Sequence, residues 1–258
     1  MTFADAKQRF SNRAADYARY RPGYPREVLD VLRAWCGLKP EHTVADIGSG
    51  TGLLAKLFLE NGNRVLGVEP NEEMRAAGEQ LLRPYPRFTG VAGSAEATTL
   101  PAGSVDFVAA AQAFHWFDAR SARREFRRIL KPQGRVIILW NERLLEETQF
   151  VRDYEGLLGR FGTDYSKVNE SYPRAEQMLA FFGECEFSSH SLPNAQDFDF
   201  DGLCGRLRSS SYVPTPAHRE FAPMMGELRR LFDAHQASGV VRMLYRTRIY
   251  AGSLESTG

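Results

Sequence analysis

The chain has 258 residues and a net charge of +1, with 33 lysines and arginines against 32 aspartates and glutamates. This balance gives no electrostatic reason to expect nucleic acid or an anionic membrane surface as a partner, so we expect a small-molecule ligand. The length suits one large α/β domain with an insertion or modest cap better than two independent domains. Cys36, Cys185 and Cys204 are too widely spaced for a disulfide framework or a zinc site, and we expect no metal.

The N-terminal residues contain no apolar run typical of a signal peptide, and no later stretch is long enough to cross a bilayer. We therefore expect a cytoplasmic protein with reduced thiols. The segment before Pro25 is polar and aromatic, and we interpret it as a helix and a loop that lie over another part of the molecule. A helix with an apolar face should begin at Pro25 and end at Gly37.

Strand-like and helical stretches then alternate. Helices are predicted at residues 53–60, after Asn71, and at 118–130. Strands that alternate with helices form a mostly parallel sheet with right-handed crossovers. The near-continuous apolar run at 105–111 is typical of a strand buried on both faces. The predicted strands are 43–47, 64–69, 88–92, 105–111 and 135–140.

The pattern loosens after Asn141. Helices at 146–161 and 175–182 should contribute to a cap, before a strand at 184–191, a helix at 217–235 and a final strand at 240–250. We predict an α/β fold, a Rossmann-like doubly wound, mostly parallel seven-stranded sheet with an antiparallel final strand and a small helical cap. Residues 1–141 would form the N-terminal lid segment and the cofactor-binding core, and residues 142–258 the cap insertion and the final strands of the same sheet.

The central motif is DIGSGTG, residues 46–52, placed between a predicted strand and a predicted helix. Glycines allow a tight turn and the close approach of a ligand, and the helix N-terminus offers unpaired amides to a carboxylate or phosphate. Glu69 ends the next strand, where an acidic side chain can accept hydrogen bonds from both hydroxyls of a ribose. Together these features predict a site for an adenosine-containing ligand.

Two cofactor classes share this description, and the spacing of the glycines separates them. A dinucleotide fingerprint GxGxxG counted from Gly48 would need a glycine where Leu53 stands. The GxGxG pattern after Asp46 resembles instead the first motif of class I S-adenosylmethionine-dependent methyltransferases. Two alternatives remain open. One is an NAD-dependent oxidoreductase, which Leu53 and the lack of a Tyr-x-x-x-Lys pair after the fifth strand disfavour. The other is a non-catalytic methyltransferase-like scaffold, which would have no need of the glycines and Glu69.

Further segments extend this resemblance over most of the chain, from about residue 10 to residue 250. The runs YARYRPGYP (17–25), GVEP (67–70), GSAE (93–96) and AQAFHWFD (111–118) are similar to the type 11 methyltransferase family. The His-Trp-Phe element at 115–117 is similar to the trans-aconitate methyltransferase-like branch of that family. The resemblance implies transfer of a methyl group from S-adenosylmethionine to a small-molecule acceptor, with S-adenosylhomocysteine as the product.

The resemblance also implies roles for single residues. The glycine turn would pass under the methionine portion of the cofactor, Asp46 would support its amino group, and Glu69 would hold its ribose. Residues 94–96 would lie at the adenine, although many relatives carry Asp where Ser94 stands. The cofactor-binding candidates are Tyr20, Asp46, Gly48, Ser49, Gly50, Gly52, Glu69, Pro70, Ser94, Ala95, Glu96 and Gln112, and Arg21 could close over the site with Tyr20.

The methyl group of a sulfonium is already activated, so the protein has to align a nucleophile with it and exclude water. A carboxylate acceptor needs no general base, whereas a phenol, an amine or an acidic carbon does. His115 is the catalytic candidate because it follows the fourth strand, at the carboxyl edge where ligands bind in such sheets. A packed histidine that shapes the pocket is the plainer interpretation.

Four further residues are candidates for binding the substrate. Trp116 and Trp140 could form an apolar wall, or be ordinary core aromatics. Arg208 and Tyr212, with Arg206 nearby, fall in a segment that we expect to be a loop, and they could receive an acidic substrate. Arginines in a loop are also commonly solvated surface.

Overall fold

Within the described residues, seven strands form one mixed sheet in the order β3-β2-β1-β4-β5-β7-β6. The computed structural model describes residues 14–163, 165, 175–183, 185 and 187–255. Strands β1 to β5 pair in parallel, and β7 runs antiparallel to both of its neighbours, β5 and β6. This topology confirms the predicted fold and the antiparallel final strand. The strands are β1 Thr43–Ile47, β2 Arg64–Val68, β3 Phe88–Val91, β4 Val105–Ala111, β5 Leu130–Arg143, β6 Phe187–Phe198 and β7 Val241–Gly252.

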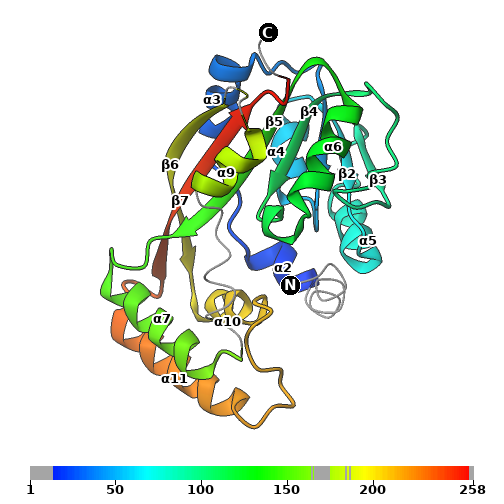
Figure 1. Cartoon of the computed structure of the whole chain (residues 1–258). Coiled ribbons are helices and arrows are strands. Elements are labelled where there is room, and N and C mark those ends of the chain that lie inside the picture. The colour runs from blue at the N-terminus through cyan, green and yellow to red at the C-terminus, as the bar shows by residue number, and fades with distance from the viewer. Residues whose placement is uncertain (1–13, 164, 166–174, 184, 186, 256–258) are drawn as a thin grey trace.

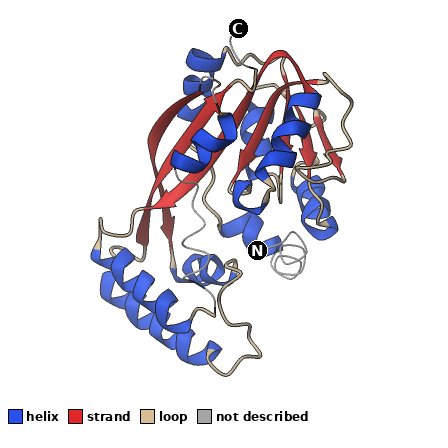
Figure 2. Cartoon of the chain, viewed as in Figure 1, coloured by secondary structure: helices blue, strands red, loops and turns tan. Residues whose placement is uncertain are grey.

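Helices cover both faces of the sheet (Figure 2). Neighbouring residues of β1 show the two faces, because Val44 packs with α3 and α4 whereas Ala45 and Ile47 pack with α6 and α9. Helix α5 lies against β3. No described helix is long and apolar enough to span a bilayer. These helices are α3 Glu27–Cys36, α4 Leu53–Glu60, α5 Glu72–Leu81, α6 Ala119–Ile129 and α9 Ala175–Phe182.

A separate helical layer lies at one end of the sheet (Figure 1). It consists of α7 (Gln149–Phe161), α10 (Phe200–Arg208) and α11 (Phe221–His235), which we call the cap. The cap has its own hydrophobic core, and Phe198 of β6 and Met243 of β7 are buried in it. The cap is therefore attached to the sheet through the cap-facing ends of these two strands.

The N-terminal helix α2 (Ala14–Tyr20) lies between the cap and the core, where it packs against α10 and α5. Helix α9 was predicted at its observed position but does not belong to the cap, because it packs against α6 on the sheet. The division of the chain at residues 141 and 142 remains an interpretation, since the sheet itself includes strands from both parts.

Three segments differ clearly from the sequence prediction. Strand β5 runs from Leu130 to Arg143 rather than from 135 to 140. Arg206 and Arg208, expected in a loop, lie in helix α10, which begins after Asp199, whose carboxylate accepts a hydrogen bond from the Gly202 N–H at 2.7 Å. Gly202 and Gly205 weaken the local helical signal, and packing against α2 compensates for it. Strand β6 continues to Phe198 rather than ending at 191, because all of its residues pair with β7. Its expected start, Glu184, lies outside the described residues.

Candidate active site

The chain leaves β1 through a turn of left-handed glycines. Gly48, Gly50 and Gly52 have φ angles of +67°, +55° and +85°, which would strain any side chain. A Cβ atom at Gly48 would also lie 2.6 Å from the Cβ of Ala113. At Gly50 the nearest atom to such a Cβ would be the Met74 methyl at 3.3 Å, so the backbone conformation is what requires glycine there. The turn leads directly into α4 and exposes main chain rather than side chains.

Glu69 follows β2 and closes on this turn. Its carboxylate accepts hydrogen bonds from the N–H groups of Gly50 and Asn71, both at 2.9 Å. Burial raises the pKa of Glu69, and these two hydrogen bonds act against that shift. Each carboxylate oxygen keeps further acceptor capacity, so ribose hydroxyls can still donate to it. Ser49 and Pro70 flank this contact, and the N–H of Ser49 donates to the carbonyl of Val68 at 3.2 Å.

Asp46 is buried at the end of β1, with 1% of its surface exposed. Burial and the nearby Glu69 carboxylate raise the pKa of Asp46 to about 7, although a backbone hydrogen bond with Ala55 lowers it. Its Oδ2 atom has no hydrogen-bond partner among the described residues. A buried carboxylate oxygen without a partner is costly, and a cationic amino group would supply what it lacks. The Asp46 carboxylate therefore fits the amino group of S-adenosylmethionine.

The segment after β3 carries the candidates for the adenine side. Ala95 is buried, and Ser94 forms an isolated bridge with Ala97. The carboxylate of Glu96 accepts a hydrogen bond from the Asp118 N–H at 2.9 Å. Glu96 therefore links this segment to the start of α6.

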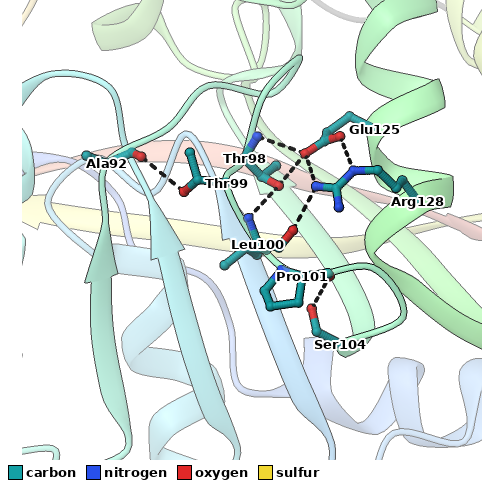
Figure 3. Close-up of polar contacts among 8 residues, drawn as sticks. All are labelled: Ala92, Thr98, Thr99, Leu100, Pro101, Ser104, Glu125 and Arg128. Atoms are coloured by element: carbon teal, nitrogen blue, oxygen red, sulfur yellow. Dashed lines mark hydrogen bonds and ion pairs between the residues drawn. The ribbon is translucent and has the colours of Figure 1, made fainter.

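A hydrogen-bond network fixes the residues that follow (Figure 3). Glu125 of α6 accepts hydrogen bonds from the N–H of Thr98 at 2.9 Å and from its hydroxyl at 2.5 Å. Arg128 donates to Glu125 at 2.7 Å and to the carbonyl of Leu100 at 2.7 Å. The Arg128 guanidinium holds the pKa of Glu125 at about 2. The network ties the loop to α6 and so positions residues 94–96.

Gln112 and Asn141 join the ends of β4 and β5. Gln112 has a φ of +54°, and its side-chain oxygen accepts a hydrogen bond from the Asn141 N–H at 3.0 Å. The Asn141 side chain donates to the carbonyl of Gly23 at 3.1 Å and accepts from the Thr247 hydroxyl at 2.6 Å. Asn194 donates to the same carbonyl at 3.0 Å. The amide of Gln112 thus positions β5, and the N-terminal segment is fixed to the sheet beside it.

Tyr20 and Arg208 join α2 to the cap. The ring of Tyr20 packs against Gly205, where a Cβ atom would collide with it, and its carbonyl accepts a hydrogen bond from Gln196 at 3.2 Å. Arg208 forms an ion pair with Asp16 at 3.4 Å and is exposed. The structure therefore places both residues at the contact between α2 and α10, and their predicted ligand contacts stay predictions.

His115 lies in the short helix η2 (Phe114–Trp116) after β4, between two tryptophans. Its ring centre is 4.6 Å from that of Trp116 and 5.1 Å from that of Trp140. Burial lowers the pKa of His115 to about 4, so the imidazole is neutral at pH 7. Its Nδ1 atom is buried without a partner among the described residues. His115 also borders a pocket of about 380 Å³, lined by Phe114, Phe117, Ala119, Arg120, Arg123, Gln177, Ala180 and Phe181.

Tyr212 is buried close to three arginines from distant parts of the chain. Burial alone would raise the pKa of its phenol, but Arg143, Arg206 and Arg21 hold that pKa below its ordinary value. Arg206 and Arg21 were candidates from the sequence, whereas Arg143 was not. A signal was available, because Arg143 lies two residues after Asn141 and so faces the same side at the carboxyl end of β5.

The fold is Rossmann-like, and the glycine turn with its two carboxylates lies at the carboxyl edge of the sheet, where ligands bind in such folds. The family model for a type 11 methyltransferase domain matches residues 45–138. The chain is 30% identical to an uncharacterized methyltransferase of Mycobacterium tuberculosis over 236 residues, which cover 90% of this chain and 89% of the relative. An uncharacterized methyltransferase of Schizosaccharomyces pombe is 33% identical over 220 residues, which cover 85% of each chain.

Solved structures agree with this assignment. A protein of Anaeromyxobacter dehalogenans assigned as a type II methyltransferase superposes with a TM-score of 0.68 at 25% identity, covering 92% of this chain and 99% of the other. The chain belongs to the S-adenosylmethionine-dependent methyltransferases. The two alternatives, an NAD-dependent oxidoreductase and a non-catalytic scaffold, are therefore set aside.

Proposed function

We propose that this methyltransferase acts on a small organic acid and holds its cofactor between Asp46 and Glu69. The observation that supports the cofactor site is the buried Asp46 Oδ2 atom, which has no hydrogen-bond partner in the described part of the chain and lies near a second acid that contacts the glycine turn. Asp46 would bind the amino group of the cofactor, and Glu69 would accept the ribose hydroxyls. The remaining cofactor contacts are proposed for Tyr20, Gly48, Ser49, Gly50, Gly52, Pro70, Ser94, Ala95, Glu96 and Gln112.

S-adenosylmethionine supplies a methyl group on a sulfonium, whose carbon–sulfur bond breaks as the new bond to the acceptor forms. If the acceptor is a carboxylate, it loses its negative charge as the oxygen–carbon bond forms, and the protein has no proton to remove. The protein's task is then to orient the acid and exclude water, for which Trp116 and Trp140 offer apolar surface. His115 is neutral at pH 7 and could accept a proton only from a different class of acceptor.

Two observations support an acid as the acceptor. The His-Trp-Phe element at 115–117 is similar to the trans-aconitate methyltransferase-like branch, and a group of arginines surrounds Tyr212. Small carboxylic acids should therefore accept tritium from methyl-labelled S-adenosylmethionine, whereas the corresponding primary amides should not. Methylation of the amides at equal rates would contradict the proposed acceptor class.

The cofactor site is tested with Glu69→Gln, which keeps the shape of the side chain and removes its charge. Loss of charged hydrogen bonds to the ribose should weaken S-adenosylhomocysteine binding about 5- to 100-fold by calorimetry. Glu60→Gln is the control, because Glu60 is an exposed acid at the far end of α4. Unchanged affinity in Glu69→Gln would remove Glu69 from the proposed site.

A further inference from the structure

Two of the three arginines around Tyr212 are almost fully buried, and only Arg143 has a carboxylate partner among the described residues. Arg206 is 4% exposed and Arg143 is 6% exposed. Arg206 donates to the Ser210 hydroxyl at 3.0 Å, and Arg21 donates to the Ser209 carbonyl at 3.0 Å. Buried charges are normally paired with an opposite charge, because desolvation of an unpaired ion is expensive.

The described residues supply this group with one carboxylate. Glu155 forms an ion pair with Arg143 at 2.5 Å. The groups that act electrostatically on Arg206 are three tyrosines and Arg143, and those that act on Arg21 are Arg206 and three tyrosines. Phenols are neutral at pH 7, so no anion among the described residues compensates the charges of Arg21 and Arg206.

Two further polar atoms in the group need an acceptor. The hydroxyl of Tyr154, a fully buried side chain, has no partner among the described residues, and neither does the Nε atom of Arg21. Tyr154 lies under the Arg143 guanidinium, which is 5.4 Å from its ring centre. Arg206 lies close enough to both Tyr154 and Arg21 to interact electrostatically with each, so a ligand oxyanion at Arg206 would offer an acceptor to these donors and offset the excess positive charge.

The position of the group relates it to the cofactor site. Arg143 ends β5 at the carboxyl edge of the sheet, and it is paired in register with Tyr245 of β7. Tyr24 lies close enough to both Asp46 and Arg21 for each to affect its ionisation. Tyr24 therefore lies between the arginine group and the carboxylate proposed to bind the cofactor.

We propose that Arg21, Arg206 and Tyr154 form the subsite that binds a carboxylate of the methyl acceptor, with Arg143 and Tyr212 completing its wall. This inference rests on the proposed function and adds the residues that determine its substrate class. A guanidinium suits this role because its planar fork can donate two parallel hydrogen bonds to one carboxylate. The site draws on the N-terminal segment, β5, α7 and α10, so an acceptor that occupies it would bridge the core and the cap.

The test measures the melting temperature of the full chain at constant ionic strength. Succinate is the carboxylate probe, succinamide is its uncharged counterpart, and inorganic phosphate is the alternative oxyanion. Succinate should raise the melting temperature of the wild type in a saturable manner, and succinamide should not. Arg206→Met should lose this rise, while its melting temperature without succinate is maintained or increased, because an unpaired buried charge has been removed. Tyr154→Phe should reduce the apparent affinity for succinate about tenfold and still fold, since it deletes one hydroxyl.

Arg248→Met is the matched control, because Arg248 lies on β7 in an ion pair with Glu142, and its response to succinate should equal that of the wild type. If Arg206→Met does not fold, Tyr154→Phe decides the result. The proposal is overturned if succinate has no effect on the wild type, if phosphate alone is effective, or if the variants respond as the wild type does. Titration with S-adenosylhomocysteine is run separately. Its failure in the wild type would count against the proposed cofactor site, whereas the succinate result is obtained without cofactor.

Discussion

Binding of the cofactor should release a proton from Asp46. In the free protein the pKa of this carboxyl is about 7, so about 0.9 of the molecules carry the proton at pH 6 and about 0.1 at pH 8. The cationic amino group of S-adenosylhomocysteine would lower this pKa and expel the proton. The expected release is therefore about 0.9 proton at pH 6 and about 0.1 at pH 8, and affinity should fall about tenfold per pH unit below 7.

Calorimetry in buffers of different ionisation enthalpy measures this release directly. In Asp46→Asn the buffer-dependent part of the heat should disappear, and the affinity should no longer vary between pH 5 and 7. Glu69→Gln separates the two acids, because Glu69 is also buried and its pKa is also raised. A wild type that releases no proton at pH 6, or an Asp46→Asn protein that releases as many as the wild type, would refute the assignment of Asp46 to the amino group.

The same buried acid makes the free protein sensitive to pH. Because the folded-state pKa lies above the unfolded value of 3.8, the contribution of Asp46 to stability is fully present below about pH 4 and is lost as the pH rises to about 7. This pKa shift corresponds to a loss of about 4 kcal/mol of unfolding free energy at pH 7 and above. Asp46→Asn should accordingly raise the free energy of unfolding of the cofactor-free protein at pH 8, measured by urea denaturation.

Two other predictions concern the surroundings of the site. Glu125→Gln should cost about 2 kcal/mol of unfolding free energy at pH 7, since the pKa of Glu125 is held at about 2 but its partner Arg128 is partly solvated. The folded-state pKa of Glu125 is depressed, so the stabilisation is present above about pH 4.5 and is lost as the pH falls towards 2. If urea denaturation shows that Glu125→Gln loses as much unfolding free energy at pH 3 as at pH 7, this account is contradicted. Gly48→Ala should cost more stability than Gly103→Ala, because both residues have positive φ angles but only Gly48 would clash, with Ala113. Equal losses in urea denaturation would mean that packing at the turn is unimportant.

The core of the fold was predictable because local signals agreed with the final structure. The strands at 43–47 and 105–111 and the helix at 53–60 have the predicted bounds, since apolar runs there are bounded by turn residues. Strand β6 was only partly predictable. It is an edge strand with mostly exposed residues and a proline at position 193, so its sequence lacks apolar alternation, and its pairing with β7 defines it.

The candidate site also has one part that could be predicted from the sequence and one part that could not. The glycine turn and Glu69 are separated by a short distance in sequence and belong to one strand–helix–strand unit, so their proximity could be predicted. The arginine group around Tyr212 is assembled from four distant segments, and no local pattern brings them together. Gly205 shows why such a contact could not be predicted from the sequence alone. In the sequence it argues against a helix, but in the structure it makes room for the ring of Tyr20.

The cap and the sheet have separate hydrophobic interiors, joined by the projecting ends of β6 and β7. A substitution in the interior of the cap, far from the side chains beneath the glycine turn, should therefore affect stability almost independently of changes at the turn. In the proposed subsite, Tyr154 and Arg206 lie on the cap helices α7 and α10, whereas Arg21 and Arg143 lie outside the cap, so selection for a new acceptor would act on both parts. Exchanging α7 and α10 between relatives, together with the residues at positions 21 and 143, would test whether these segments determine the methyl acceptor.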